Sequence, residues 1–347
     1  MKQVTIFLGN QCNAGCYYCH AAKEKDQFTE ISPRLLDWLK QQTGLTVKFL
    51  GGEPTLYLEH IATVIKHCGD MSSYILMTNG LLLNNDQVVD FLNQHDILTI
   101  VSFDGLPGAR GYDDIFLKDA YRDNLKRINK LGAAATISNV NCDLKAIRQC
   151  YAAIENKLQR YLPLFVHATH TTNSDLTGYE LSDSQYDAFL AYKKNTIIKL
   201  IDEFDRGVIN LKLKQIVHAY LDDVRYSLDE TRCYNRHHII TDIAGNNYVC
   251  GYGKGLQVGQ FGSEESFALQ KQILDEKLPQ CQQCELRSQC GVACIASINM
   301  KKECDHTKQF LSWLNREDIH TRLSLIKTVI QQVPLLNQTG NFFYGGF

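Results

Sequence analysis

Two groups of closely spaced cysteines dominate the chemistry that this sequence could perform. The chain has thirteen cysteines, and ten of them fall into these groups, one near each end. The first group is Cys12, Cys16 and Cys19, with the spacing C-x3-C-x2-C. Where thiols are kept reduced, grouped cysteines bind metal more often than they form disulfides. The sequence therefore predicts two metal-binding regions.

The second group lies in a glycine-containing stretch with little periodic pattern. Its seven members are Cys233, Cys250, Cys281, Cys284, Cys290, Cys294 and Cys304. Thiolates are the usual ligands of a [4Fe–4S] cluster, and three of them leave one iron open to a small molecule. Zinc is an alternative for the first group, with His20 as fourth ligand, and a redox pair is another. Cys281-x2-Cys284 by itself would also suit a zinc ribbon.

Short apolar runs alternate with amphipathic stretches over the first 170 residues. The runs cover residues 4–8, 46–50, 74–77, 98–103, 133–139 and 164–168. The amphipathic stretches cover residues 33–42, 58–68, 87–94, 120–131 and 144–158, and Gly132 is expected to end the fourth of these helices. Six β–α units predict an α/β fold, a partial (β/α)6 TIM-like barrel. Its chemistry would lie in the loops at the carboxyl ends of the strands.

The distribution of apolar, polar and cysteine residues divides the chain into four segments. We expect a core domain over residues 1–210, including a helix at 183–205, and then a helical linker over 211–230. A cysteine-bearing domain over 231–313 and a C-terminal helix and tail over 314–347 would follow. Little periodic structure surrounds the seven cysteines, so we expect metal rather than a hydrophobic core to organise that domain.

Glycine-rich and polar motifs follow the first four apolar runs, where the loops of such a barrel would meet. They are C-x3-C-x2-C, Gly51-Gly52-Glu53-Pro54, Thr78-Asn79-Gly80 and Ser102-Phe103-Asp104-Gly105. Together these motifs, in this order, resemble those of radical S-adenosylmethionine (SAM) enzymes. The resemblance implies a [4Fe–4S] cluster on Cys12, Cys16 and Cys19 whose open iron binds SAM. Reductive cleavage of SAM would then give a 5′-deoxyadenosyl radical that abstracts a hydrogen atom from the substrate.

The same resemblance implies which residues contact SAM. Glu53 and its loop would hold the ammonium group, Ser102 and Asp104 would reach the ribose, and the backbone of Tyr18 would lie against the adenine. The full set of expected SAM-binding residues is Tyr18, Gly51, Gly52, Glu53, Pro54, Thr78, Asn79, Ser102 and Asp104.

The seven-cysteine array resembles the SPASM domain, which accompanies radical SAM enzymes that modify peptides. This implies two auxiliary [4Fe–4S] clusters, and three clusters in all. One auxiliary cluster would use Cys281, Cys284, Cys290 and Cys304, and the other would use Cys233, Cys250 and Cys294. Residues 224–232 contain no cysteine to complete the second set. An open iron, or a cap from Tyr234, His237 or His238, is expected there.

The sequence does not identify the catalytic residue, but it offers three candidates. His167 and His170 are candidates because they lie at the end of the sixth apolar run, and Cys142 is a candidate hydrogen-atom donor. Cys68 and Cys150 lie in amphipathic stretches and are expected to pack as small apolar side chains. Gly251 stands where sulfatase maturases carry an aspartate base, which disfavours sulfatase maturation.

The expected function is SAM-dependent radical modification of a peptide or protein, by cross-linking, epimerisation or oxidation. A ribosomal precursor peptide is one such substrate, and flavodoxin or ferredoxin would donate electrons to this oxidoreductase chemistry. An amino-sugar dehydrogenase of the same superfamily is one alternative. A non-catalytic iron–sulfur protein that carries electrons or senses oxygen is another, although such a protein needs no SAM-binding motifs.

Charge and hydropathy limit the partners and the location. The formal net charge of −2 and the pI of about 6.6 imply no general attraction to nucleic acid or anionic membranes. The longest apolar runs, such as residues 97–103, are too short to cross a bilayer, and no signal peptide is recognised. We therefore expect a cytoplasmic protein. Because the first strand begins at once, a substrate's leader is expected to bind the barrel, the cluster domain or a separate protein.

Overall fold

A computed structural model describes most of the chain. The described residues are 2–19, 30–106, 108–111, 115–169, 178–209, 226–250, 256–260, 265–292, 294–297 and 299–332. Residues 211–225 of the expected helical linker lie outside this part. His20, His170, Gly251 and the tail from residue 333 also lie outside it.

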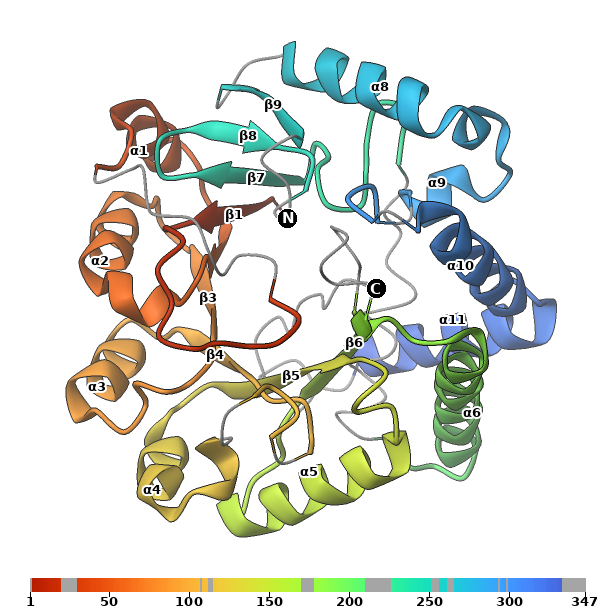
Figure 1. Ribbon diagram of the computed structural model, residues 1–347, viewed down its shortest axis with the longest axis horizontal. Helices are drawn as coiled ribbons and strands as arrows, with labels where there is room; N and C mark the ends of the chain where they lie inside the picture. The colour runs from red at the N-terminus through yellow and green to blue at the C-terminus, as the bar shows by residue number, and fades with distance from the viewer. Residues whose placement is uncertain are drawn as a thin grey trace.

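The strands of the described part form one curved sheet in the order β6-β5-β4-β3-β2-β1-β7-β8-β9 (Figure 1). Their bounds are β1 Gln3–Phe7, β2 Thr46–Leu50, β3 Ser73–Thr78, β4 Leu98–Ser102, β5 Leu131–Ile137, β6 Leu164–Ala168, β7 His238–Asp242, β8 Asn246–Tyr248 and β9 Gln257–Gln260. Strands β1 to β6 pair in parallel with their neighbours in chain order. The predicted α/β fold with six parallel β–α units is confirmed.

Helices lie on the outer side of the sheet and alternate with the parallel strands (Figure 1). The first six are α1 Pro33–Lys40, α2 Leu58–His67, α3 Asp86–Gln94, α4 Asp119–Arg127, α5 Leu144–Leu158 and α6 Asp183–Asp205. Later helices are α8 Glu265–Lys277, α9 Arg287–Cys290, α10 Met300–Leu314 and α11 Glu317–Gln332. Short 3-10 turns are η1 Pro54–Tyr57, η2 Ile115–Leu117 and η5 Pro279–Gln283.

One predicted helix boundary is wrong. Helix α4 ends at Arg127, and β5 already begins at Leu131, so Gly132 lies inside a strand and not at a helix end. Gly132 pairs with Ile100 of β4. The apolar residues at this point fit both a helix end and a strand start, and the parallel pairing with β4 decides between them.

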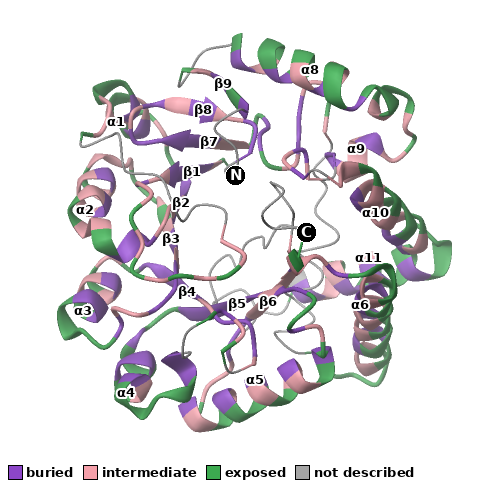
Figure 2. Ribbon diagram, in the orientation of Figure 1, coloured by how far each residue is buried: buried purple, intermediate pink, exposed green. Residues whose placement is uncertain are grey.

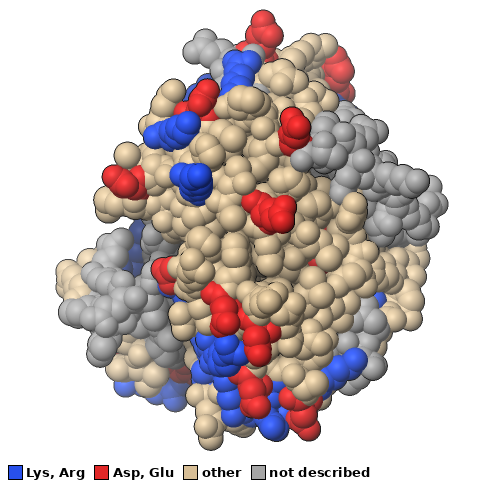
Figure 3. All heavy atoms as spheres, turned by 90° about the vertical axis from the view of Figure 1, so that its left-hand side faces the viewer, with Lys and Arg blue, Asp and Glu red and all other residues tan. Residues whose placement is uncertain are grey.

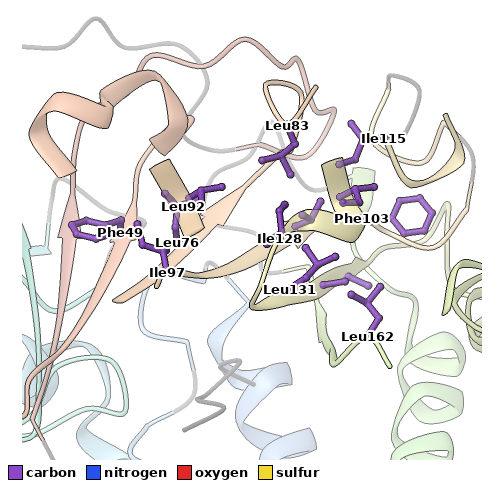
Figure 4. Packing of buried hydrophobic residues seen from close by; sticks show 14 of the residues in the cluster. Phe49, Leu76, Leu83, Leu92, Ile97, Phe103, Ile115, Ile128, Leu131 and Leu162 are labelled. Carbon is purple, nitrogen blue, oxygen red and sulfur yellow. The ribbon is translucent and has the colours of Figure 1, made fainter. Parts of the chain in front are cut away.

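The main core lies between the inner sheet and the surrounding helices. Figure 2 shows that the buried residues concentrate on the strands and on the inward faces of the helices. Phe49, Leu76 and Phe103 come from the strand region, and Leu92 comes from α3; all are at most 1% exposed. Figure 4 shows these side chains in one continuous layer. Burial of apolar surface on this scale is the main force that holds the strand ends in register.

The cysteine-rich region is joined to the barrel through the sheet. Strand β7 pairs in parallel with β1, with Gln3 opposite His238 and Phe7 opposite Asp242. This region also has its own buried apolar cluster, which contains Tyr234, Val249 and Val258. The expectation that metal alone would organise it, without a hydrophobic core, is therefore wrong. Its apolar residues are short runs separated by glycines and cysteines, so no periodic pattern revealed them.

Helices α6, α10 and α11 form a separate layer that packs through an apolar cluster including Ile197, Phe310 and Leu323 (Figure 1). No helix in the described part of the chain is long and apolar enough to cross a membrane. On the face that Figure 3 shows, charged side chains of both signs are mixed, most densely in the lower part of the view. Such mixing is illustrated by Arg127, which contacts both Asp86 and Asp90 at 2.6 Å.

Candidate iron–sulfur and SAM site

The loop after β1 carries the first cysteine group and packs closely against the loop after β2. Gly52 N donates to the carbonyl of Gly9 at 2.8 Å, and Glu53 N donates to that of Gln11 at 2.8 Å. A Cβ atom on Gly52 would lie only 2.3 Å from the Gln11 carbonyl oxygen. Glycine is therefore required here because two backbones approach each other, and this approach fixes the start of the cysteine loop.

Glu53 is fully buried and ties together the loops after β2 and β3. Its Oε1 accepts hydrogen bonds from the Thr55 backbone N (3.0 Å), the Thr55 hydroxyl (2.6 Å) and the Thr78 hydroxyl (2.6 Å). Its Oε2 accepts one from Asn79 N at 2.7 Å. The carboxylate is thus satisfied by the protein itself, at 0% exposure. Gly51 and Gly52 of the same loop are partly exposed, and the contact of this loop with the SAM ammonium stays a prediction.

The Thr78-Asn79-Gly80 turn reaches the cysteine loop directly. Asn79 Nδ2 donates to Asn13 Oδ1 at 2.8 Å and lies 3.7 Å from Cys12 Sγ. Asn79 Oδ1 accepts from Leu81 N at 2.8 Å, which fixes the amide orientation. The structure therefore brings the second and third predicted motifs against the first.

Asp104 joins the fourth motif to the same loop. Tyr18 OH donates to Asp104 Oδ2, and the backbone N of Thr136 donates to Oδ1 at 2.9 Å. Arg110 Nη1 lies 3.3 Å from Oδ1 and donates to Tyr18 OH at 2.9 Å, while its Nη2 lies 3.2 Å from Cys16 Sγ. Asp104 is 0% exposed and Ser102 is partly exposed; the contact of this pair with ribose stays a prediction.

Burial dominates the electrostatics of this network. It raises the pKa of Asp104 in spite of the opposing effect of the Arg110 charge. Burial, with the nearby Asp104 carboxylate, also raises the pKa of Tyr18 well above its usual value, so the phenol stays protonated and can donate. Sequence reasoning missed Arg110, because it lies in an ordinary loop and belongs to no motif.

The thiols of the first group lie near one another and are partly exposed. Burial raises the pKa of Cys12, and the charges of Glu53 and Cys16 raise it further, against hydrogen bonds from Ala14 N and Asn79. Three adjacent thiols beside a buried arginine form a donor set that fits a [4Fe–4S] cluster. Loading such a cluster requires the thiols to lose their protons.

The second group of cysteines separates into two sets in space. Cys250, only 3% exposed, is hydrogen-bonded with Cys233 and Cys294. These two contacts, together with burial, raise the pKa of the Cys250 thiol well above its usual value. The set coincides with the three residues that the SPASM resemblance assigned to one auxiliary cluster.

The other four cysteines line one cavity between η5, α9 and α10. Its lining includes Cys281, Cys284, Cys290 and Cys304 together with Arg287 and Lys308. Burial raises the pKa of Cys281, Cys290 and Cys304, and the charges of neighbouring cysteines of the set add to this effect. Four thiols around one cavity fit a fully ligated [4Fe–4S] cluster.

The spacing of these groups also bears on the kind of metal centre. Among the described residues, no three His, Cys, Asp or Glu side chains have the arrangement expected around a single metal ion. A [4Fe–4S] cluster binds each thiolate to a different iron, so its ligands need not converge on one point.

In the part of the chain that the structure describes, the set of Cys233, Cys250 and Cys294 lacks a fourth ligand. The residues expected as possible caps, Tyr234, His237 and His238, differ in their surroundings. His238 Nε2 lies 2.8 Å from the Thr5 hydroxyl and 3.2 Å from Gln3 Nε2, and the ring also bonds to the backbone of Arg232. The imidazole is thus bound within the β1–β7 pair, which argues against His238 as a cap. His237 is exposed, and Tyr234 is 2% exposed.

The catalytic candidates lie in different places. His167 Nε2 is 3.0 Å from the Thr136 hydroxyl, directly across from it in the β5–β6 pair, so His167 is connected through Thr136 to the Asp104 network. Cys142 Sγ instead lies 3.1 Å from Gln185 Nε2 of α6. The structure describes no contact between Cys142 and the SAM motifs. Cys68 and Cys150 pack against the main core, as expected.

Comparison with known proteins agrees with this site. A family described as a 4Fe-4S single cluster domain matches residues 2–106, which contain all four motifs, including the first cysteine group. An uncharacterized protein, MJ0907, of Methanocaldococcus jannaschii is 23% identical over 284 residues, which cover 78% of this chain and 92% of that protein.

Two solved structures show the fold with ligands bound. The anSMEcpe structure with bound AdoMet and Kp18Cys peptide is 16% identical, with a TM-score of 0.66, and the match covers 94% of this chain and 99% of that one. Streptococcus suis SuiB bound to precursor peptide SuiA is 14% identical, with a TM-score of 0.55 and coverage of 85% and 72%.

The fold, with its cysteine loop at the end of β1, is that of the anSMEcpe and SuiB structures. At the level of the fold, the resemblance that the sequence motifs indicated is confirmed.

Proposed function

We propose that this protein is a radical SAM enzyme with three [4Fe–4S] clusters that modifies a peptide or protein substrate. The observation that supports this most is the grouping of the seven C-terminal cysteines. One set surrounds Cys250 and the other lines a separate cavity, in addition to the cysteine loop after β1. A protein that only bound SAM at one cluster would not need these two further sets.

Within this proposal, Cys12, Cys16 and Cys19 would hold the first cluster, and the cluster with SAM would supply the radical chemistry that removes a hydrogen atom from the substrate. The protein's own residues hold the parts in place. Glu53 and Asn79 fix the loops beside Cys12, and Arg110 gives Cys16 a hydrogen-bond donor that carries a positive charge. His167 lies at the carboxyl end of β6, where the substrate of such a barrel is expected.

The structurally similar proteins favour a peptide substrate. The printed descriptions of anSMEcpe and SuiB include a bound peptide and a bound precursor peptide, respectively. For this chain the change is proposed to be a cross-link, an epimerisation or an oxidation, and Gly251 in place of an aspartate argues against sulfatase maturation. A flavodoxin or ferredoxin in the cytoplasm is proposed to supply the electrons.

The test begins with anaerobic reconstitution, followed by addition of SAM and a reductant. Formation of 5′-deoxyadenosine is expected, whereas its absence from protein with full iron content would favour a non-catalytic iron–sulfur protein. Substrate is then tested by co-expression with any short peptide encoded by a neighbouring gene. A mass loss equal to two hydrogen atoms indicates cross-linking or oxidation, and deuterium uptake from heavy water indicates epimerisation. Turnover of an amino sugar instead of any peptide would contradict the peptide assignment.

A further inference from the structure

Arg287 is a buried arginine in the wall of the four-cysteine cavity. It begins the short helix α9, between Cys284 and Cys290, and is 6% exposed. Together with Lys308 it supplies the positive charge of the cavity lining; the other lining residues are the four cysteines and apolar side chains.

One arm of the guanidinium is fixed by the backbone. Nη2 donates to the carbonyl oxygens of Ser227 at 3.0 Å, Leu228 at 3.3 Å and Glu230. Such a set of carbonyls holds the planar group in one orientation. Nη1 is buried and, among the described residues, has no hydrogen-bond partner. A buried cationic donor left unpaired is costly, so this atom indicates a missing acceptor.

The charges around Arg287 indicate what that acceptor is. Asp229 and Glu230 lie near it, but both carboxylates are engaged by Arg236, at 2.8 Å each. The thiols of Cys281 and Cys290 are its strongest electrostatic partners. The side-chain acceptors near Arg287 that Arg236 does not engage are therefore sulfur atoms.

A [4Fe–4S] cluster bound by four thiolates carries net negative charge, which increases when it is reduced. Hydrogen bonds to its sulfur atoms and nearby cations stabilise the reduced state and raise the reduction potential. We propose that Arg287 is a positioning residue for the cluster in this cavity, with Nη1 donating to a cysteine sulfur or a cluster sulfide and raising its reduction potential. This inference rests on the proposed function only in requiring a cluster there.

The test compares Arg287→Met and Arg287→Lys in the full chain after anaerobic reconstitution. A background with Cys12, Cys16 and Cys19 changed to alanine leaves only the two auxiliary clusters for EPR-monitored redox titration. At a fixed potential we expect Arg287→Met to lower the ratio of reduced to oxidised cluster at least tenfold, which corresponds to 59 mV for one electron. Arg287→Lys, which keeps the charge but loses the planar fork, should fall between. Arg316→Met, at an exposed arginine paired with Asp318, is the matched control.

An unchanged potential in Arg287→Met overturns the proposal. If Arg287→Met fails to load iron, the lysine variant decides: a lowered potential supports the role, and a wild-type potential overturns it. The iron content of Cys284→Ala distinguishes a failure of this inference from a failure of the proposed function. A loss of about four irons per chain places a cluster in the cavity. No loss means that the cavity holds no cluster, which overturns this inference while SAM cleavage at the first cluster is still tested by 5′-deoxyadenosine formation.

Discussion

Arg110 Nη2 lies 3.2 Å from the sulfur of Cys16, although the two residues are 94 positions apart in the chain. The same guanidinium contacts Asp104 Oδ1 at 3.3 Å through Nη1, and Asp104 is fully buried. One arginine thus pairs a buried carboxylate and a predicted cluster ligand. The loop after β4 is thereby connected to the loop after β1 at the position where SAM chemistry is proposed.

Arg110→Met should destabilise the metal-free protein by about 3 kcal/mol, because it leaves the Asp104 carboxylate buried without its cation. Adding Asp104→Asn should recover part of the loss, since the uncompensated charge is then gone. Urea unfolding under reducing conditions measures both values. Arg122→Met, which removes an exposed arginine that pairs with Asp119 and Asp123, is the control and should change little. Equal losses for Arg110→Met alone and for the double variant would contradict the prediction.

Glu53→Gln should cost about 2 kcal/mol of unfolding free energy, because an amide NH₂ would then face donors that now bond to the carboxylate. The donors on Thr55, Thr78 and Asn79 all bond to this one side chain. Denaturant unfolding checks the loss, and calorimetry on the loaded protein checks SAM affinity. Glu59→Gln, at an exposed position in the first turn of α2, serves as the control. A stable variant with wild-type SAM affinity would show that the network is dispensable.

The sequence predicted the repetitive part of the fold well because apolar periodicity is a local signal. The predicted bounds of β2, β6, α5 and α6 agree with the structure. The pairing of β7 with β1 joins residues more than 230 positions apart, and nothing in either segment specifies its partner. Sheet continuity between the barrel and the cysteine-rich region was therefore outside the reach of pattern analysis.

The sequence predicted the cysteine groups and the loops that carry the motifs. It did not predict the partners of the buried side chains in those loops. The two sets of C-terminal cysteines follow the spacing-based division. In contrast, Glu53 and Asp104 are each 0% exposed and bonded within the protein, and the motifs did not indicate these partners. A motif shows that a carboxylate is needed and does not show which protein groups bind it. Arg110 belongs to no motif, and only the fold brings it beside sulfur. Arg287 lies between Cys284 and Cys290, but the spacing of the cysteines does not show that its side chain is buried in the cavity wall.

Acid should destabilise the protein through His238, whose pKa is lowered from 6.5 to about 3 by burial and then by the charge of Lys48. The unfolded chain gains a proton here as the pH falls below 6.5, and the folded chain does not. Stability is therefore full above pH 6.5 and decreases towards pH 3, by at most about 1.4 kcal/mol per pH unit. His238→Asn should flatten this dependence in unfolding experiments, whereas His237→Asn, at the exposed neighbour, should keep it. The same slope in both variants would assign the acid sensitivity to other groups.

Cys250→Ser should reduce the iron content of the anaerobically reconstituted protein by about four atoms per chain, from an expected total of about twelve. The reason is that Cys250 is buried and contacts both Cys233 and Cys294, so its loss removes the central ligand of that set. Cys68→Ser is the matched control, because Cys68 packs against the main core and should leave iron unchanged. Metal analysis by mass spectrometry and the visible absorption of the clusters check both variants. Zinc in place of iron in the wild-type protein would contradict the cluster assignment itself, since the thiols would then serve a structural metal without redox chemistry.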